Sequence, residues 1–382
     1  MTPRLLAWRL ASFYGAVFAA VGFVLPFWPV WLDARGLTGA EIGALLAAST
    51  VSRILAAPLV ARVADRTGER KRLIVLLIGA SFACWSLFPL AHGFWALLAI
   101  SMAAQGCSAA AMPLFEDMTL GAVRAHAFEY GRIRLAGSVT FLVAASAGGL
   151  WLTGRASGDV LALMILGSGL MLATALLLPD LRATQRLTVD LIGGLRAILG
   201  RRGFRGLFLA SGLIQASHMV YYGFATLHWR ATGLSDGFIG ALWAEGVIAE
   251  IVLFWYGGSL RRRLPPAGLI AIGGVAGAVR WLGTGLTVDP AALVALQALH
   301  GISFGATHLG SMYYLRDRAP PGLTATTQGL YSALPMGILG GLTMLAAGPL
   351  FGALGPGAFQ AMTALALVGA LVAGALLRMD DR

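Results

Sequence analysis

The sequence has few charged side chains for its length. Asp, Glu, Lys and Arg make up 12% of its 382 residues, whereas hydrophobic residues make up 58%. A water-soluble domain carries about 25% charged residues. Most of the surface of this protein therefore does not face water, which argues against a soluble enzyme or a soluble binding domain.

Cysteine and lysine are also scarce. The two cysteines, Cys84 and Cys107, both lie in apolar runs, so we expect small core residues rather than a disulfide or a metal pair. Lys71 is the only lysine among 28 basic residues. The net charge of +11 comes from short basic clusters between apolar runs, which does not favour nucleic-acid binding.

What the chain does contain is apolar runs of membrane-spanning length. A spanning helix needs about 20 such residues, and twelve spans with short connections leave no room for a sizeable soluble domain. We therefore predict an all-α membrane protein. The predicted spans are 10–32, 39–61, 73–91, 94–120, 133–154, 159–179, 206–229, 237–260, 267–287, 290–315, 323–350 and 357–377.

The basic residues predict the orientation. If the N-terminus is cytoplasmic, Arg35, Arg155 and Arg230 lie outside, Arg53 and Arg280 lie within spans, and the remaining 23 of the 28 lie in cytoplasmic segments. This bias predicts that both termini are cytoplasmic. We expect a multi-pass protein of the plasma membrane, which in a bacterium is the inner membrane.

The two halves of the chain resemble each other. Gly36–Thr38 and Ile42–Leu45 recur as Gly233–Ser235 and Ile239–Leu242, an offset of 197 residues. Parallel repeats of six helices are the architecture of the major facilitator fold. We predict two six-helix halves, 1–180 and 206–382, joined by a basic cytoplasmic linker, 181–205.

The segment between the second and third spans, 61–71, resembles the major facilitator loop signature G-x-x-x-D-R-x-G-x-R-K, with Ala61 in place of the first Gly. Glycine permits a tight turn, and a carboxylate can pair with an Arg or a helix N-terminus. The resemblance implies a latch that holds one conformation shut. Its candidate gating residues are Asp65, Arg66, Gly68 and Arg70.

Three ionisable residues share a predicted depth near the membrane midplane. Arg280 and His300 each lie ten residues from Pro290, and Glu250 lies eleven residues before Arg261. At 1.5 Å per residue these separations are about 15 Å and 16 Å. Charge at this depth is costly, so it indicates a cavity or a partner. An inert Glu250–Arg280 ion pair is the alternative.

Two further polar stripes are candidates. Glu116 and Arg134 each lie nine residues from the predicted inside turn at Ala125, so they can meet across the fourth and fifth spans. His300, Phe304 and His308 share a face of the tenth span. No Cys or carboxylate accompanies these histidines on their span, so we expect no metal and no other cofactor.

Several segments resemble known carriers over nearly the whole chain. Gly22 with 26–32 and Tyr130–Ser138 look like the first span and the fifth-span entry of lactose permease-like carriers. Ala249–Ile251, Arg280 with Trp281, and 299–304 with His308 look closer to the phenylpropionate permease-like branch. The chain is thus identified as resembling major facilitator proton symporters.

The resemblance implies roles for individual residues. Positions matching Glu116 and Arg134 bind substrate, and those matching Glu250, Arg280 and His300 carry substrate recognition and proton coupling. This chain has Ser303 where lactose permeases have a carboxylate, and Phe141 where they have a sugar-stacking Trp. The first difference leaves the proton carrier open between Glu250 and Glu116, and the second weakens a disaccharide interpretation.

We therefore expect a monomeric proton symporter of a small organic solute, working by alternating access in the lipid bilayer. Two arginines suit a carboxylate and the cavity aromatics suit a ring, which favours aromatic or other monocarboxylates, with sugars or nucleosides next.

The alternatives are a proton-driven exporter of drugs or metabolites, and a non-transporting sensor or membrane-embedded enzyme. The sequence lacks an H-E-x-x-H motif, and we expect no enzyme. The expected substrate-binding residues are Glu116, Arg134, Phe141, Arg280, His300, Phe304 and His308, and those for proton coupling are Glu250, Glu116 and His300.

Overall fold

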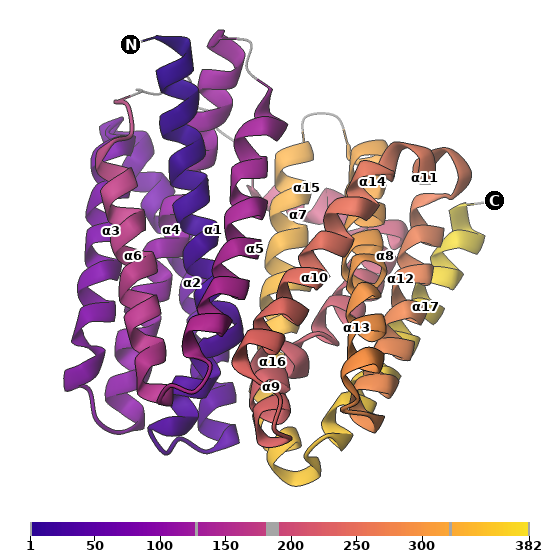
Figure 1. Cartoon of the computed structure of the whole chain (residues 1–382). Coiled ribbons are helices and arrows are strands. Elements are labelled where there is room, and N and C mark those ends of the chain that lie inside the picture. Colours follow the sequence, from indigo (N-terminus) through magenta and orange to yellow (C-terminus); the bar gives the residue numbers. More distant parts are fainter. Residues whose placement is uncertain (1, 127–128, 181–190, 321–322, 381–382) are drawn as a thin grey trace. The chain divides into compact units, whose positions relative to one another are not determined.

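The computed structural model describes residues 2–126, 129–180, 191–320 and 323–380, and within these ranges the chain is helical, with no strand. Contacts divide it into two compact units (Figure 1). The first unit consists of Met1–Leu37, Leu45–Arg186 and Leu234–Ala244, and the second of Thr38–Ala44, Leu187–Gly233 and Glu245–Arg382. Part of the predicted linker 181–205 lies outside the described residues, and the rest includes the short helix α7 (Leu191–Leu199).

Six long helices account for most of the first unit, and short 3₁₀ turns follow the third and fifth of them. Figure 1 shows these helices running side by side. Their bounds are α1 Pro3–Ala34, α2 Gly39–Thr67, α3 Arg70–Leu87, η1 Phe88–Leu90, α4 Phe94–His126, α5 Tyr130–Leu152, η2 Ser157–Asp159 and α6 Val160–Leu176.

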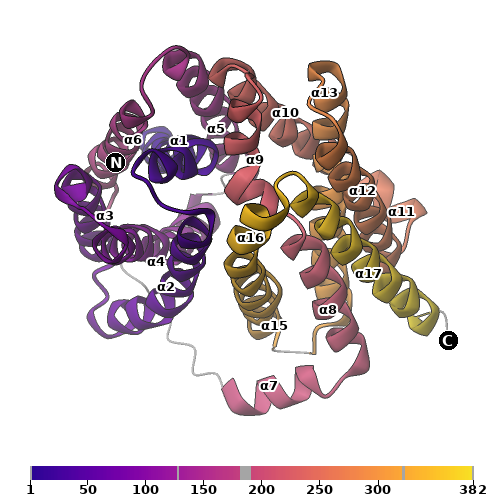
Figure 2. The ribbon, with the colours of Figure 1, turned by 90° about the horizontal axis from the view of Figure 1, so that it is seen from below.

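Helix α1 is the centre of the first unit, where it packs against both α5 and α6 (Figure 2). It begins with Pro3, whose missing N–H costs nothing in a first turn, and Thr2 caps it by accepting from the Leu5 N–H at 3.4 Å. Gly22 permits the approach of α5, because a Cβ there would lie 2.9 Å from the carbonyl oxygen of Phe141. The core around α1 is apolar and includes Leu10, Phe13 and Phe115.

The second unit has more breaks in its helices. The predicted span 206–229 is two helices, α8 and α9, that meet at Ser217 and His218. Two other spans contain π-helical turns, η3 and η4. The bounds are α8 Arg202–Ala216, α9 Met219–Ala231, α10 Asp236–Trp255, α11 Gly257–Arg263, α12 Pro266–Leu286, α13 Pro290–Ala298, η3 Gly301–Ala306, α14 Thr307–Arg318, α15 Thr324–Tyr331, η4 Ser332–Leu339, α16 Gly340–Leu354 and α17 Gly357–Asp380. The part of α10 before Glu245 is assigned to the first unit.

Helix α12 packs against α14 and α17 in the second unit (Figure 2). Among the described residues, eleven helical segments are long and apolar enough to cross a membrane. The remaining predicted span, 206–229, is the α8–α9 pair, each half of which is too short alone. Large apolar side chains such as Leu59, Leu90 and Leu371 remain exposed, as expected for surfaces that contact lipid.

Candidate functional site

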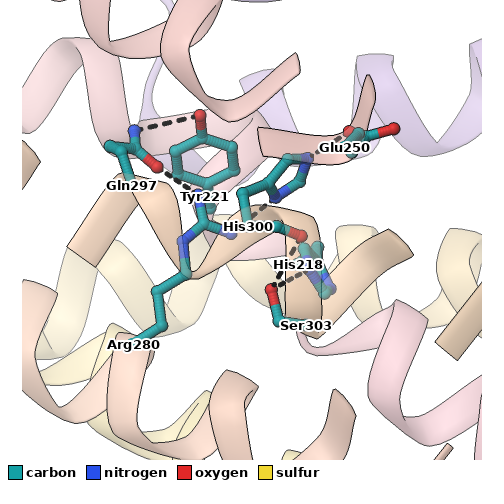
Figure 3. Close-up of polar contacts among 7 residues, drawn as sticks. All are labelled: His218, Tyr221, Glu250, Arg280, Gln297, His300 and Ser303. Atoms are coloured by element: carbon teal, nitrogen blue, oxygen red, sulfur yellow. Dashed lines mark hydrogen bonds and ion pairs between the residues drawn. The ribbon is translucent and has the colours of Figure 1, made fainter. Parts of the chain in front are cut away.

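The second unit holds a buried chain of polar side chains from three elements (Figure 3). Glu250 comes from α10, Arg280 from α12, and His300 from the junction of α13 and η3. Arg280 and His300 are 1% and 6% exposed, and the side chain of Glu250 is 17% exposed. The three residues that share a predicted depth are thus neighbours in the structure.

Glycines explain how α10 comes close enough for these contacts. A Cβ on Gly301, the residue after His300, would lie 2.5 Å from the carbonyl oxygen of Ala249. A Cβ on Gly246 would lie 3.2 Å from the His300 ring. The backbones therefore approach at Gly301, where only glycine leaves room, and Gly246 makes space for the His300 ring. Glu250, the residue after Ala249, is brought to His300 by this approach.

His300 links the arginine to the carboxylate. Its Nδ1 lies 2.8 Å from Nη1 of Arg280, and its Nε2 lies 2.8 Å from Oε1 of Glu250. A guanidinium can only donate, so Nδ1 accepts and the neutral ring carries its proton on Nε2. His300 therefore donates its Nε2–H to Glu250. This hydrogen bond to a neutral histidine takes the place of the direct Glu250–Arg280 ion pair that was the alternative.

Arg280 is held on every side. Its Nη2–H donates to the side-chain oxygen of Gln297, and the Gln297 Nε2–H donates to the Tyr221 hydroxyl at 3.1 Å. The guanidinium carbon lies 4.4 Å from the ring centres of both Tyr221 and Trp281. Such cation–π contacts stabilise a desolvated cation. Gln297 and Tyr221 were not predicted as site residues, although Gln297 stands three residues before His300, on the same helical face.

A second histidine lies beside this chain. His218 is fully buried at the junction of α8 and α9, and its Nδ1 lies 3.0 Å from the Ile214 carbonyl oxygen, which can only accept. Its Nε2 therefore accepts from the Ser303 hydroxyl at 3.3 Å. Ser303, the position where similar permeases have a carboxylate, thus serves a neutral hydrogen bond (Figure 3).

Aromatic rings line one side of His300. The His300 and Phe304 rings stack with centroids 5.4 Å apart, and Phe304 stacks on His308 at 6.0 Å. His218 adds an edge contact to Phe304 at 5.9 Å. The predicted stripe of the tenth span is therefore a continuous stack of three rings along η3 and α14.

The first unit contains a separate charged cluster. The Tyr130 hydroxyl donates to Oε2 of Glu116 at 2.9 Å, and Nη1 of Arg134 lies 3.7 Å from the other carboxylate oxygen. Because the Tyr130 hydrogen is engaged, the Tyr14 hydroxyl donates to Tyr130 at 3.2 Å. Arg134 also lies over the ring of Phe18 at 5.6 Å. The structure brings Glu116 and Arg134 together, and adds Tyr14 and Tyr130, which were not predicted as site residues.

The remaining predicted residues lie apart from these clusters. Phe141 is buried where α5 meets α1. Gly68 has a φ of 71°, in the left-handed region that favours glycine. Arg70 forms an ion pair with Asp117 of α4, whereas Arg66 is exposed. The side chain of Asp65 is outside the described part, and its predicted pairing stays a prediction.

Charged side chains that are buried between long apolar helices are typical of a polytopic membrane transporter. A family model described as the MFS_1 like family matches residues 7–361. The chain belongs to this family of major facilitator transporters, and it is a transporter rather than an enzyme.

Relatives and solved structures agree. The chain is 32% identical over 361 residues to the "Probable 3-phenylpropionic acid transporter" of Escherichia coli, covering 94% of each chain. It is 27% identical over 340 residues to the maltose permease of Geobacillus stearothermophilus, covering 85% of this chain and 83% of the permease. The crystal structure of the nucleoside transporter NupG superposes with a TM-score of 0.83 at 15% identity, covering 99% of each chain. The predicted major facilitator fold is thereby confirmed.

Proposed function

We propose that this transporter is a proton-coupled symporter of a small aromatic monocarboxylate, with both termini cytoplasmic and a monomer as its working unit. The observation that carries the proposal is the buried chain Arg280–His300–Glu250. The relative from Escherichia coli that aligns with 94% of this chain is named a "Probable 3-phenylpropionic acid transporter". An aromatic carboxylate also suits the ring stack formed by His300, Phe304 and His308.

Charge balance supplies the coupling. With Glu250 ionised, its negative charge offsets the positive charge of Arg280 on the far side of His300. Protonation of Glu250 leaves one uncompensated positive charge in a buried site, where electrostatic energies are larger than in water. A substrate carboxylate restores neutrality. Proton and anion therefore favour each other's binding, which is the thermodynamic requirement for symport.

In this coupling, the Nε2–H of His300 is the hydrogen-bond donor that Glu250 and the substrate share. Its Nε2–H donates to Glu250 when that carboxylate is charged. A protonated carboxyl is a weaker acceptor, because charge-assisted hydrogen bonds are about twice as strong as neutral ones. The Nε2–H then becomes a donor for the substrate carboxylate. We assign Glu116, Arg134 and Phe141 in the first unit as further substrate contacts, and Asp65, Arg66, Gly68 and Arg70 as the gate.

The test uses purified protein in liposomes with an imposed proton gradient. Uptake of labelled 3-phenylpropionate should exceed equilibrium when the outside is acidic, and a protonophore should abolish the excess. A benzoate, a disaccharide and a nucleoside in parallel define the substrate class. Uptake that equilibrates but never accumulates would show that proton coupling is wrong. Accumulation in everted vesicles but not in right-side-out vesicles would instead establish the exporter.

A further inference from the structure

The surroundings of Arg280 leave little room for a ligand. One terminal nitrogen donates to Gln297, the other to His300, and the rings of Tyr221 and Trp281 each lie 4.4 Å from the guanidinium carbon. The side chain is 1% exposed. A substrate carboxylate could reach this cation only by displacing one of these contacts. Its position instead suits an action through His300.

Gln297 determines where that guanidinium points. Because Arg280 only donates, the amide oxygen of Gln297 must face it, and the amide nitrogen is then directed at the Tyr221 hydroxyl. Gln297 is 2% exposed and Tyr221 is 2% exposed, so water does not replace either bond. The pair holds Nη2 in place and thereby aims Nη1 at His300.

We propose that Gln297 and Tyr221 are positioning residues that act through Arg280 to keep His300 neutral, with its single ring proton on Nε2. The Nη1–H of Arg280 occupies Nδ1, so that nitrogen cannot take a proton while the arrangement lasts. The Nε2–H then has one place to point, which is Glu250. This proposal rests on the proposed function, in which that N–H passes between Glu250 and the substrate.

Among the described residues, other titratable groups face the ring of His300. His218 and Tyr221 face it with ring centroids 5.5 Å and 6.1 Å away, and Tyr222 stacks behind His218. His308 lies two turns along the same helical segment, separated from His300 by Phe304. The atoms that contact the ring nitrogens are Nη1 of Arg280 and Oε1 of Glu250.

The consequence for Arg280 differs from the expectation drawn from the sequence. Arg280 becomes a positioning residue, and the carboxylate of the substrate is recognised by the Nε2–H of His300. A fixed tautomer matters for a carrier, because a histidine that gained a second proton would carry charge of its own. Transport would then depend on the protonation of two groups instead of one.

The direct measurement is the protonation of His300 in lipid, by nitrogen NMR on protein labelled at its six histidines. The His300 signals are those absent from the His300→Gln variant. In the wild type, Nδ1 should stay bare and Nε2 protonated down to pH 5. In Gln297→Leu, and in Tyr221→Phe, which keeps the ring over Arg280, both nitrogens should be protonated at pH 5.

Transport supplies the second readout. In the Glu250→Gln background, where that carboxylate no longer titrates, exchange of labelled 3-phenylpropionate should be flat from pH 5 to 8. Adding Gln297→Leu should introduce a fall of at least threefold toward pH 5. Gln215→Leu, which removes another buried glutamine of the same unit, should leave the profile flat and the His300 signals unchanged.

Each outcome decides the proposal separately from the proposed function. A wild-type His300 that carries its proton on Nδ1, or that takes a second proton by pH 5, would overturn the assignment. So would unchanged His300 signals in both variants, or identical changes in Gln215→Leu. If the NMR results hold while accumulation proves independent of protons, the positioning role stands and proton coupling is wrong.

Discussion

His300 lies between a cation and a carboxylate, with Nε2 positioned 2.8 Å from Oε1 of Glu250. The contact joins α10 to the junction of α13 and η3, so the protonation of one side chain affects two membrane-spanning segments. Both residues belong to the second unit.

Glu250→Gln should uncouple transport. The amide has the shape of the protonated carboxyl but cannot release a proton, so substrate should bind and exchange at near wild-type rates without accumulating. Counterflow and gradient-driven uptake in liposomes measure the two activities. Glu245→Gln, on the same helix but about 140° around it, is the matched control and should accumulate normally. Normal accumulation by Glu250→Gln would place the coupling group elsewhere.

Accumulation should follow the pH gradient rather than the membrane potential. One proton moving with one monocarboxylate carries no net charge, so a potassium–valinomycin potential alone should drive no accumulation. A gradient with the outside more acidic should drive uptake, up to about tenfold for each pH unit, since one unit is worth about 1.36 kcal/mol. A potential-driven uptake would mean more than one proton per anion.

Glu116→Gln should weaken substrate affinity and keep coupling. The change removes the charged acceptor that Tyr130 and Arg134 share, at 2.9 Å and 3.7 Å. Because Arg134 is half exposed, the loss should be modest, a rise in KM of about three- to tenfold, or about 0.7–1.4 kcal/mol. Tyr130→Phe, which removes one bond to the same carboxylate, should give a smaller rise.

The same experiment addresses the rival proton carrier. A Glu116→Gln protein that exchanges substrate but no longer accumulates it would assign proton coupling to the first unit. The accumulation ratio at saturating substrate separates that outcome from an effect on affinity alone.

Gly301→Ala should damage coupling through geometry alone. A Cβ there would lie 2.5 Å from the Ala249 carbonyl oxygen, so the backbones must separate and the His300–Glu250 contact must lengthen. We expect accumulation to fall more than exchange, with a lower melting temperature. Gly329→Ala, at a helical glycine with open space around it in the same unit, should change neither. Full accumulation by Gly301→Ala would show that the close approach is dispensable.

The basic residues predict that the segment containing Arg196 is cytoplasmic. In a variant lacking Cys84 and Cys107, a cysteine at 196 should resist a membrane-impermeant thiol reagent applied from outside, and one at 156 should react. Both positions are exposed in the structure, so access by the reagent reports the side of the membrane. Labelling of 196 from outside would reverse the orientation.

Helix geometry explains what could be predicted from the sequence. The rise per residue is constant, so counting from Pro290 and Arg261 places Arg280, His300 and Glu250 at one depth. The same counting placed Glu116 and Arg134 opposite each other. Counting residues does not show which neighbouring helix a side chain faces. For that reason His300 was not expected to stand between Arg280 and Glu250, and Gln297 was not expected to hold Arg280.

Backbone irregularities were also beyond the sequence. The break at Ser217 and His218 has neither Gly nor Pro to signal it, and the run 206–229 therefore appeared as one span. The π-helical turn after His300 likewise follows from packing against neighbours rather than from a local motif. The glycines were visible, but which backbone each one meets depends on the assembled helices.

The π-helical turn η3 has an evolutionary consequence. Its hydrogen bonds close one residue later than those of an α-helix, so the turn accommodates an extra residue between α13 and α14. Deleting one residue from Gly301–Ala306 would restore α-helical winding and preserve the facing of both flanking segments. The same deletion inside α14 would rotate every later side chain by about 100°. Length variation among descendants of this sequence should therefore concentrate at the turn next to His300.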